Sequence, residues 1–196
     1  MLFKLRHHMY VIEEKILLSN NKVKDTQPPI LVVVMGVSGC GKTTLGKVIA
    51  NHFDFTFLDA DSFHTKDAIK QMSEGIPLTD EQRAPWIARI CKKLSHFEYQ
   101  NKSCVLAYSG LKQHHRELIF SAYNCAKAIL LDADQAIIAQ RLAGRGEHFM
   151  SPKLLSSQIA AMEPINTSAV ENIELLTLSV NDTVESLLLN SINFIN

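Results

Sequence analysis

Five short apolar segments recur along the chain, and most are followed by a stretch in which apolar residues return every three or four positions. The apolar segments are expected to be strands, at residues 30–35, 55–61, 103–108, 126–132 and 172–180. The first has no polar interruption, which is typical of a strand that is buried on both faces of a sheet. Helical spacing follows it at residues 43–50 and closes the chain at residues 183–195. Strands that alternate with helices predict a parallel sheet between two layers of helices.

A long polar stretch separates the second strand from the third. It has helical character over residues 65–97, and Thr79 and Gln82 match a capping box at the start of a helix. We therefore expect a helical insert at about residues 64–98. A second irregular stretch, the glycine-containing segment "AGRGEHFMSP", predicts a short lid at about residues 144–152. Loops of this kind close over phosphates and exclude water.

The amino-terminal segment, residues 1–29, differs from the rest of the chain. It has some basic character, but Glu13 and Glu14 interrupt its apolar stretch, which argues against a secretory signal. No apolar run approaches the length of a membrane span. We expect a flexible arm or a short extra helix that ends at Pro28 and Pro29, followed by one domain at residues 30–196.

Composition and charge narrow the class of protein. Of the residues, 46% are hydrophobic and 20% are charged, as in a soluble globular domain. The charges of twenty basic and twenty acidic side chains cancel. We therefore expect no broad positive electrostatic field that would attract nucleic acid or a membrane surface. The four cysteines form no C-x-x-C pair and lack the spacing of metal ligands, which predicts reduced thiols and a cytoplasmic location.

The stretch "GVSGCGKT" lies between the first strand and the first helix and fits the phosphate loop G-x-x-x-x-G-K-[ST] at every fixed position. A glycine bend at a helix N-terminus presents several N–H groups and a positive dipole end to an anion. Lys42 would reach the β- and γ-phosphates, and the Thr43 hydroxyl would ligate Mg²⁺. The nucleotide contacts are expected from Gly36, Val37, Ser38, Gly39, Cys40, Gly41, Lys42, Thr43 and Thr44.

Two carboxylates end the second strand. Asp59 and Asp61 stand two positions apart, so an extended chain would direct both to the same side. Ligands of open α/β sheets bind at the carboxyl edge of the strands, and the pair therefore predicts a catalytic or metal-binding site there. The residues alone fit equally well a solvated turn whose carboxylates cap the next helix.

Cations occur in pairs four residues apart after later strands. Lys112 and Arg116 suit a carboxylate-bearing substrate or the travelling phosphoryl group, although surface helices also carry such pairs for solubility. Arg141 and Arg145 precede the "GEHF" segment of the expected lid, and they fit equally a basic helix end that complements the helix dipole. Arg83, in the insert, is a further candidate for a clamp on a substrate carboxylate.

From residue 33 to about residue 164 the chain resembles the gluconokinases, small P-loop sugar-acid kinases that are related in fold to shikimate and nucleoside monophosphate kinases. The matching stretches are "MGVSGCGKTT", "LDADSFH", "MSEGIPLTDEQRAPW", "SGLKQHHREL", "RLAGRGEHFM" and "SQIAAMEP". The resemblance implies an α/β, three-layer αβα P-loop kinase fold. Its parts would be a five-stranded parallel sheet, a helical substrate-binding insert and a short lid.

The resemblance also implies an activity and roles for single residues. ATP would donate its γ-phosphoryl group to D-gluconate, with Mg²⁺ as cofactor, and Asp61 would accept the proton of the substrate hydroxyl. The implied catalytic residues are Lys42, Asp61 and Arg145, and the implied metal site is Thr43 with Asp59. The implied substrate contacts are Asp61, His64, Arg83, Lys112 and Arg116, and Arg141 would contact adenine.

The chain departs from the family pattern at six positions, namely Ala60, Thr65, Ala68, Tyr108, Gly110 and His115. Ala60, Ala68, Tyr108 and Gly110 are expected on the substrate side, so they leave the identity of the sugar acid open. Alternatives are a kinase of another small sugar acid or a shikimate-like acid, and a catalytically weakened nucleotide-binding relative. Shikimate kinases carry a G-G-G stretch, whereas this chain has no Gly-Gly pair. The N-K-x-D motif of GTP-dependent switches is also absent. The oligomeric state stays open, with a homodimer as one option.

Overall fold

The computed structural model describes residues 27–143, 154–166 and 173–196. Most of the expected arm, the expected lid and Arg145 lie outside these residues, so the predictions for them stay predictions. Within the described ranges, no helix is long and apolar enough to cross a membrane. All four cysteines are free thiols, as predicted.

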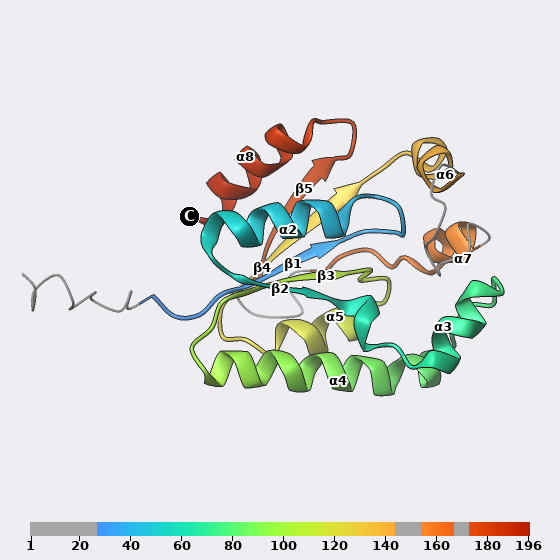
Figure 1. The fold of residues 1–196 in the computed structure, drawn as a ribbon, viewed down its shortest axis with the longest axis horizontal. Helices are drawn as coiled ribbons and strands as arrows, with labels where there is room; N and C mark the ends of the chain where they lie inside the picture. Colours follow the sequence, from blue (N-terminus) through green and yellow to red (C-terminus); the bar gives the residue numbers. More distant parts are fainter. Residues whose placement is uncertain (1–26, 144–153, 167–172) are drawn as a thin grey trace, which may run out of the picture.

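The centre of the molecule is a five-stranded parallel sheet, as predicted (Figure 1). Its strands lie in the order β2-β3-β1-β4-β5, and every adjacent pair is parallel. All five lie within the expected segments: β1 Leu31–Met35, β2 Thr56–Asp59, β3 Cys104–Tyr108, β4 Ala126–Asp132 and β5 Glu174–Ser179. The central position of β1 explains why its five residues are all buried and all apolar.

Strand β1 divides the core into two halves, because successive side chains point to opposite faces of a sheet. Leu31, Val33 and Met35 belong to one buried cluster, which includes side chains of α4 (Asp80–Tyr99) and α5 (Gln113–Phe120). Val32 and Val34 belong to the other, which includes side chains of α2 (Lys42–Phe53) and α8 (Val184–Ile195). Figure 1 shows these helix pairs on opposite sides of the sheet, so the three-layer prediction is confirmed.

Strand β2 is shorter than expected. It covers Thr56–Asp59, and the chain then turns into the 3₁₀ helix η1, Ala60–Phe63. Asp59 caps this turn by accepting a hydrogen bond from the backbone N–H of Asp61. The expectation that both carboxylates lie on one extended chain is therefore wrong, because the capping carboxylate itself ends the strand.

The polar insert consists of two helices, α3 (Lys66–Ser73) and α4. The capping box predicted at the start of α4 is present: the Thr79 hydroxyl accepts from the Gln82 N–H, and the Gln82 side chain accepts from the Thr79 N–H. This reciprocal pair satisfies two backbone donors that a helix start otherwise leaves open. It fixes the point at which the chain turns back along the sheet.

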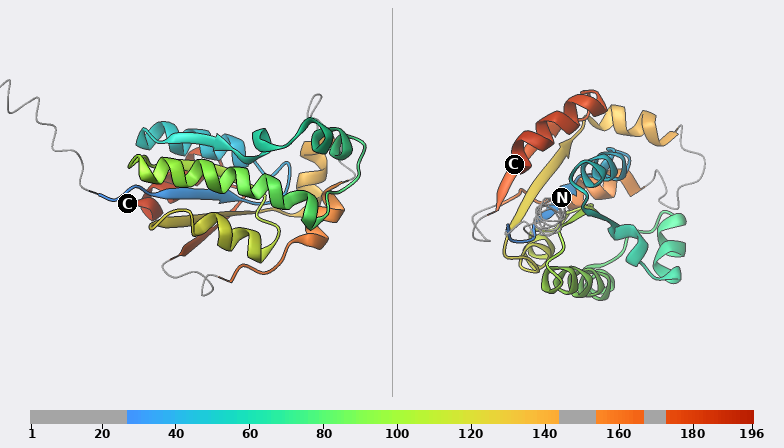
Figure 2. Two further views of the ribbon diagram at one scale, coloured as in Figure 1. Left: turned by 90° about the horizontal axis from the view of Figure 1, so that it is seen from below. Right: turned by 60° about the vertical axis from the view of Figure 1, so that its left-hand side comes forward.

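Three helices lie beyond the carboxyl ends of the strands: α3, α6 (Gln135–Ala143) and α7 (Leu154–Ala161) (Figures 1 and 2). Helix α7 was not expected from the hydrophobic pattern. Its Leu154 packs with Met72 and Leu78 of the insert in a small separate cluster. The edge of the sheet that carries the phosphate loop is thus walled by segments far apart in the sequence.

Candidate active site

The phosphate loop has the backbone that an anion site requires. Gly36, Gly39 and Gly41 all have positive φ. At Gly36, where φ is 138°, a Cβ would lie 2.8 Å from the Leu131 carbonyl oxygen, so no other residue fits. Helix α2 begins at Lys42 with no capping side chain and no acidic residue in its first turn. Its N–H groups and dipole are therefore left for a bound anion.

The polar side chains of the loop are held in place by the surrounding protein. The Lys42 ammonium donates to the Val37 carbonyl oxygen at 2.9 Å. The Thr43 hydroxyl donates to the Asp59 carboxylate at 3.1 Å, and the second oxygen of this carboxylate accepts the Asp61 N–H. A hydroxyl beside a carboxylate is the pair of hard oxygen donors that Mg²⁺ prefers, and this ion usually takes its other ligands from phosphates and water.

Two pockets flank the loop. One, here named the Asp61 pocket, contains Ser38, Lys42 and Asp61. The other, here named the Arg141 pocket, contains Cys40, Gly41 and Thr44 of the loop together with residues of β4, α6, the β5–α8 turn and α8. The loop therefore separates two ligand-sized spaces, and Lys42 faces the first.

Arg141 lies in the second pocket, where it was expected to contact adenine. Its guanidinium donates to the Val180 carbonyl oxygen at 2.9 Å, which holds the side chain against the turn after β5. The pocket also contains Leu131 and Leu187, so it combines apolar walls with one planar cation. This arrangement suits a flat aromatic base.

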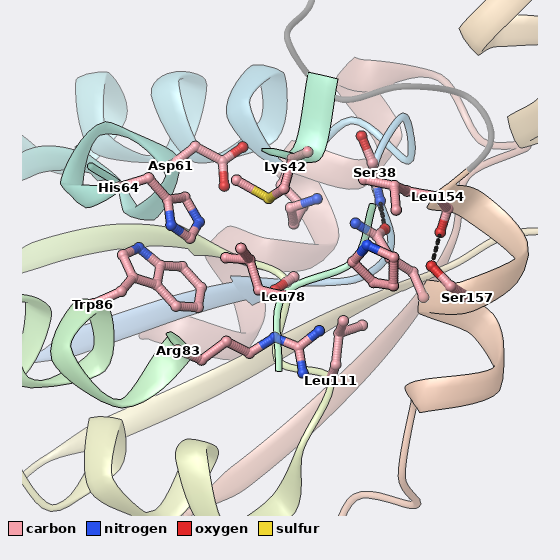
Figure 3. A pocket seen from close by; sticks show the side chains of 14 residues that line it. Ser38, Lys42, Asp61, His64, Leu78, Arg83, Trp86, Leu111, Leu154 and Ser157 are labelled. Atoms are coloured by element: carbon pink, nitrogen blue, oxygen red, sulfur yellow. Dashed lines mark hydrogen bonds between the residues drawn. The ribbon is translucent and has the colours of Figure 1, made fainter. Parts of the chain in front are cut away.

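The Asp61 pocket brings together four of the residues that were predicted for catalysis or substrate binding. Lys42, Asp61, His64 and Arg83 all line it, and they come from α2, η1, the segment after η1 and α4. Figure 3 shows Lys42, Asp61 and His64 on one side of the pocket and Arg83 on the other. The space between them is suited to a small polar anion with hydroxyl groups.

The imidazole of His64 is held by a stacked tryptophan. The His64 and Trp86 rings are parallel within 15° with centroids 4.2 Å apart, and the Trp86 indole donates to the Ala60 carbonyl oxygen at 2.7 Å (Figure 3). Burial, followed by the charges of Arg89 and Arg83, lowers the pKa of His64 to about 4. Its Nδ1 is the one buried side-chain nitrogen or oxygen without a hydrogen-bond partner among the described residues. A neutral ring with an unused nitrogen suits a ligand hydroxyl.

The Arg83 guanidinium is oriented by its own helix. It donates to the Asp80 carboxylate at 2.9 Å, and its side chain is 17% exposed. One N–H group of the guanidinium is thus bonded to the first turn of α4, and the Arg83 side chain still lines the Asp61 pocket. A bidentate contact with a carboxylate needs a guanidinium in such a fixed orientation.

Lys112 and Arg116 do not line the Asp61 pocket. Lys112 precedes α5 instead of lying within it, and its ammonium pairs with Glu163 at 3.0 Å. Arg116 is 1% exposed, and its guanidinium donates to the carbonyl oxygens of Gly110, Leu111, Glu163 and Pro164 and to the Gln113 side chain. The prediction of substrate contact for this pair is not supported by their positions, because both cations already hold the segment that follows α7.

Four of the departures from the family pattern, Ala60, Ala68, Tyr108 and Gly110, were expected on the substrate side of the site. Ala60 and Tyr108 are buried, and Ala68 packs against the cluster of Met72, Leu78 and Leu154. Gly110 has φ of 63°, and a Cβ there would lie 2.8 Å from the Met35 sulfur. None of the four lines the Asp61 pocket. The expectation that they line the substrate side is therefore not supported by their positions.

Sequence reasoning missed two polar residues whose side chains accept hydrogen bonds from distant segments of the chain. The Gln158 side chain of α7 accepts a hydrogen bond from the Ser38 N–H at 2.7 Å. The Glu163 carboxylate accepts from Lys112 and from the Gln113 N–H at the start of α5. Both belong to the stretch "SQIAAMEP", whose match to the family pattern was the available signal. No local pattern assigns them a partner.

A parallel sheet with a phosphate loop after its central strand, a Thr–Asp pair beside the loop and a polar pocket at the lysine end defines a P-loop phosphotransferase of small molecules. The AAA domain family model matches residues 31–165. A gluconokinase from Arabidopsis thaliana is 32% identical over 83% of this chain and 94% of its own length. The thermosensitive gluconokinase of Escherichia coli is 36% identical over 67% of this chain and 70% of its own length.

A solved structure supports the same assignment. An unliganded sugar kinase from Janibacter sp. is 32% identical to this chain, with a TM-score of 0.79 over 86% of this chain and 95% of its own. The chain belongs to the gluconokinase family of small P-loop kinases.

Proposed function

We propose that this protein transfers the γ-phosphoryl group of ATP to the primary hydroxyl of D-gluconate and releases 6-phospho-D-gluconate and ADP. The observation that carries the proposal is the Asp61 pocket, which adjoins the lysine end of the phosphate loop. Its carboxylate and its guanidinium suit the hydroxyl end and the carboxylate end of a sugar acid, respectively. The names of the relatives supply the particular acid.

The proposed reaction is an in-line displacement at the γ-phosphorus. Asp61 accepts the proton of the primary hydroxyl, whose oxygen forms the new bond to phosphorus. The bond between phosphorus and the β,γ-bridging oxygen breaks, and its electron pair leaves with ADP. A positioned base of this kind contributes typically about 10²–10⁴-fold in rate.

Charge neutralisation is assigned to two cationic side chains, Lys42 and Arg145, and to one ion that Thr43 and Asp59 would hold. Lys42 would leave the Val37 carbonyl oxygen or share its ammonium between this oxygen and the phosphates. Thr43 and Asp59 would hold Mg²⁺, directly or through its waters, and this ion neutralises phosphate charge when it is bound. Arg145, which lies outside the described residues, stays the proposed lid cation.

Recognition of the acid is assigned to the opposite wall of the pocket. Arg83 would bind the gluconate carboxylate, and the neutral His64 ring would exchange a hydrogen bond with a gluconate hydroxyl. We propose that Lys112 and Arg116 support this wall through their contacts with residues 162–166 instead of touching the acid. We also propose a cytoplasmic enzyme, on the basis of its four free thiols.

The test is a screen of acceptors with the purified protein and MgATP. ADP release would be followed with gluconate, other six-carbon sugar acids and shikimate, and ³¹P NMR would identify the phosphorylated carbon. We expect the highest kcat/KM for gluconate and a phosphate on C6. Preference for another acid would show that the reaction class is right and the substrate wrong. ADP release that no acceptor stimulates would contradict the proposal and support a weakened relative.

A further inference from the structure

One peptide group of the phosphate loop is held at both ends by side chains. The group joins Val37 to Ser38. Its N–H donates to Gln158 Oε1 at 2.7 Å, and its carbonyl oxygen accepts from the Lys42 ammonium at 2.9 Å. The carbonyl oxygen also accepts the Cys40 N–H at 3.3 Å. Because a peptide group is planar with N–H and C=O pointing in opposite directions, fixing the N–H also fixes the direction of the carbonyl that holds Lys42.

The contact with Gln158 is buried and spans the fold. Ser38 and Gln158 are each 8% exposed, and 120 positions separate them in the sequence. A hydrogen bond donated by the N–H of a peptide group strengthens its carbonyl as an acceptor, and a buried setting increases this effect. Gln158 therefore acts on the same oxygen that holds the lysine ammonium.

The location of this peptide group links it to the chemistry. Ser38 and Lys42 line the Asp61 pocket, whereas Cys40, Gly41 and Thr44 line the Arg141 pocket on the other side of the loop. Figure 3 shows the dashed bond from Ser38 at the edge of the Asp61 pocket. The group thus lies at the end of the loop where phosphoryl transfer is proposed.

Contacts at the carboxyl end of α7 hold this helix in place, and they therefore also hold the position of Gln158. Directly after the helix, the carbonyl oxygens of Glu163 and Pro164 accept from the buried Arg116, and the Glu163 carboxylate accepts from Lys112. The helix is therefore tied to α5 at its carboxyl end and to the phosphate loop through Gln158. A glycine with φ of 89° follows Ser38, and without the glutamine the Val37–Ser38 peptide would keep only the contacts of its carbonyl oxygen described above.

We propose that Gln158 is a positioning residue for phosphoryl transfer, which sets the direction of the Val37–Ser38 peptide and through it the resting position of the Lys42 ammonium. The proposal rests on the phosphotransferase activity proposed above. It assigns α7 a part in catalysis although the helix supplies no group that reacts.

The experiment compares two variants of Gln158 with a control on the same helix. Gln158→Met keeps the length of the side chain and removes the acceptor, whereas Gln158→Glu keeps an acceptor oxygen. The control is Ile159→Met, because Ile159 is 38% exposed and lines neither pocket. For each variant, kcat and KM with MgATP and gluconate are measured, together with hydrogen exchange of the Ser38 amide.

We expect Gln158→Met to lower kcat about tenfold or more, with KM for gluconate within about twofold, and to speed Ser38 amide exchange. Gln158→Glu should restore slow exchange and most of kcat while raising KM for MgATP, because its charge repels phosphate. The control should match the wild type. Wild-type kcat in Gln158→Met, or a Gln158→Glu variant as impaired in kcat as Gln158→Met, would overturn the proposal.

A double-mutant cycle separates positioning from a general structural role. If Gln158 acts through Lys42, adding Gln158→Met to Lys42→Ala should change the residual single-turnover rate by less than about twofold. An equal loss in both backgrounds would overturn the proposal. Failure of the proposed function is distinguishable, since a wild-type protein that does not phosphorylate gluconate would still show whether Ser38 exchange depends on Gln158.

Discussion

The phosphate-binding part of the site and the adjoining Asp61 pocket are built in different ways. The phosphate-binding part comes from one contiguous stretch, β1, the loop and the first turn of α2, and it uses backbone N–H groups. The Asp61 pocket takes its walls from the loop, η1, the insert helices, the segment after β3 and α7. Triphosphate is a ligand that many enzymes share, so a local backbone motif can bind it. A particular acid must be recognised by side chains, and these come from several segments that only the packing of the domain brings together.

This difference has a consequence for tolerance to change. A backbone site depends on a few glycines and one lysine, whereas the Asp61 pocket depends on side chains that neighbours hold in place, such as His64 on Trp86 and Arg83 on Asp80. Substitutions on the phosphate side should therefore abolish the reaction with any acid. Substitutions at the residues of the pocket that bind the acid, such as Arg83 and His64, should change which acid is used and how tightly it binds.

The largest effect is expected for Lys42→Ala. Lys42 is the one cation within the loop, so its loss removes charge neutralisation in the transition state and should lower kcat/KM by at least about 10³-fold. The loop backbone is held by its glycines, and the fold should survive. Initial rates and circular dichroism check this. A folded variant with near wild-type turnover would contradict the phosphate-loop interpretation.

The next effect separates the two carboxylates. Asp61→Asn keeps the shape and removes the base, so kcat should fall about 10²-fold or more with little change in MgATP affinity. Asp59 contacts Thr43, so Asp59→Asn should mainly raise the Mg²⁺ concentration that gives half the maximal rate. Rates measured across Mg²⁺ and gluconate concentrations check both variants. The reverse pattern would exchange the two roles.

A smaller and more selective effect is expected for Arg83→Gln. If Arg83 binds the acid carboxylate, KM for gluconate should rise about tenfold or more, since a charge-assisted bidentate contact is worth roughly 1.5–3 kcal/mol. KM for MgATP should stay within about twofold, because the residue lies on the opposite wall. Steady-state kinetics with each substrate varied in turn provide the check. Equal changes in both KM values would indicate a general disturbance of the pocket.

Arg116→Met provides the matched contrast. Arg116 lies outside the pocket and satisfies four backbone carbonyl oxygens, so its loss should lower the free energy of unfolding by about 1–3 kcal/mol. KM for gluconate should change far less than in Arg83→Gln. Urea unfolding and kinetics below the unfolding transition measure the two quantities. A large rise in KM for gluconate with an unchanged free energy of unfolding would indicate that Arg116 contacts the substrate after all.

The smallest effect concerns pH. His64 has a pKa of about 4 in the fold and an ordinary value of 6.5 when unfolded, because burial and two arginines disfavour its charged form. The unfolded chain therefore binds the extra proton first as pH falls, and stability should drop between pH 6.5 and 4 by an amount on the order of 1 kcal/mol. His64→Phe keeps an aromatic ring against Trp86 and should flatten this part of the curve. An unchanged pH dependence of the unfolding midpoint would show that His64 is not buried as a neutral ring.

Local patterns in the sequence determined the elements and the phosphate side of the site. The uninterrupted apolar run of β1, the glycine spacing of the loop and the Thr79–Gln82 box each act within a few residues, where the chain has little choice of partner. The parallel sheet and its covering helices follow from the alternation of such elements. These features were therefore predictable, with errors at boundaries such as the end of β2.

Tertiary structure decided which cations line the Asp61 pocket and which are enclosed away from it. Arg83 and Arg116 are both arginines near the carboxyl edge of the sheet, yet one lines the pocket and the other is enclosed by carbonyl oxygens. Gln158 had no assigned role until the fold placed it against Ser38. The physical reason is that hydrogen-bond partners far apart in the sequence meet only through packing of the whole domain, and no local spacing encodes them.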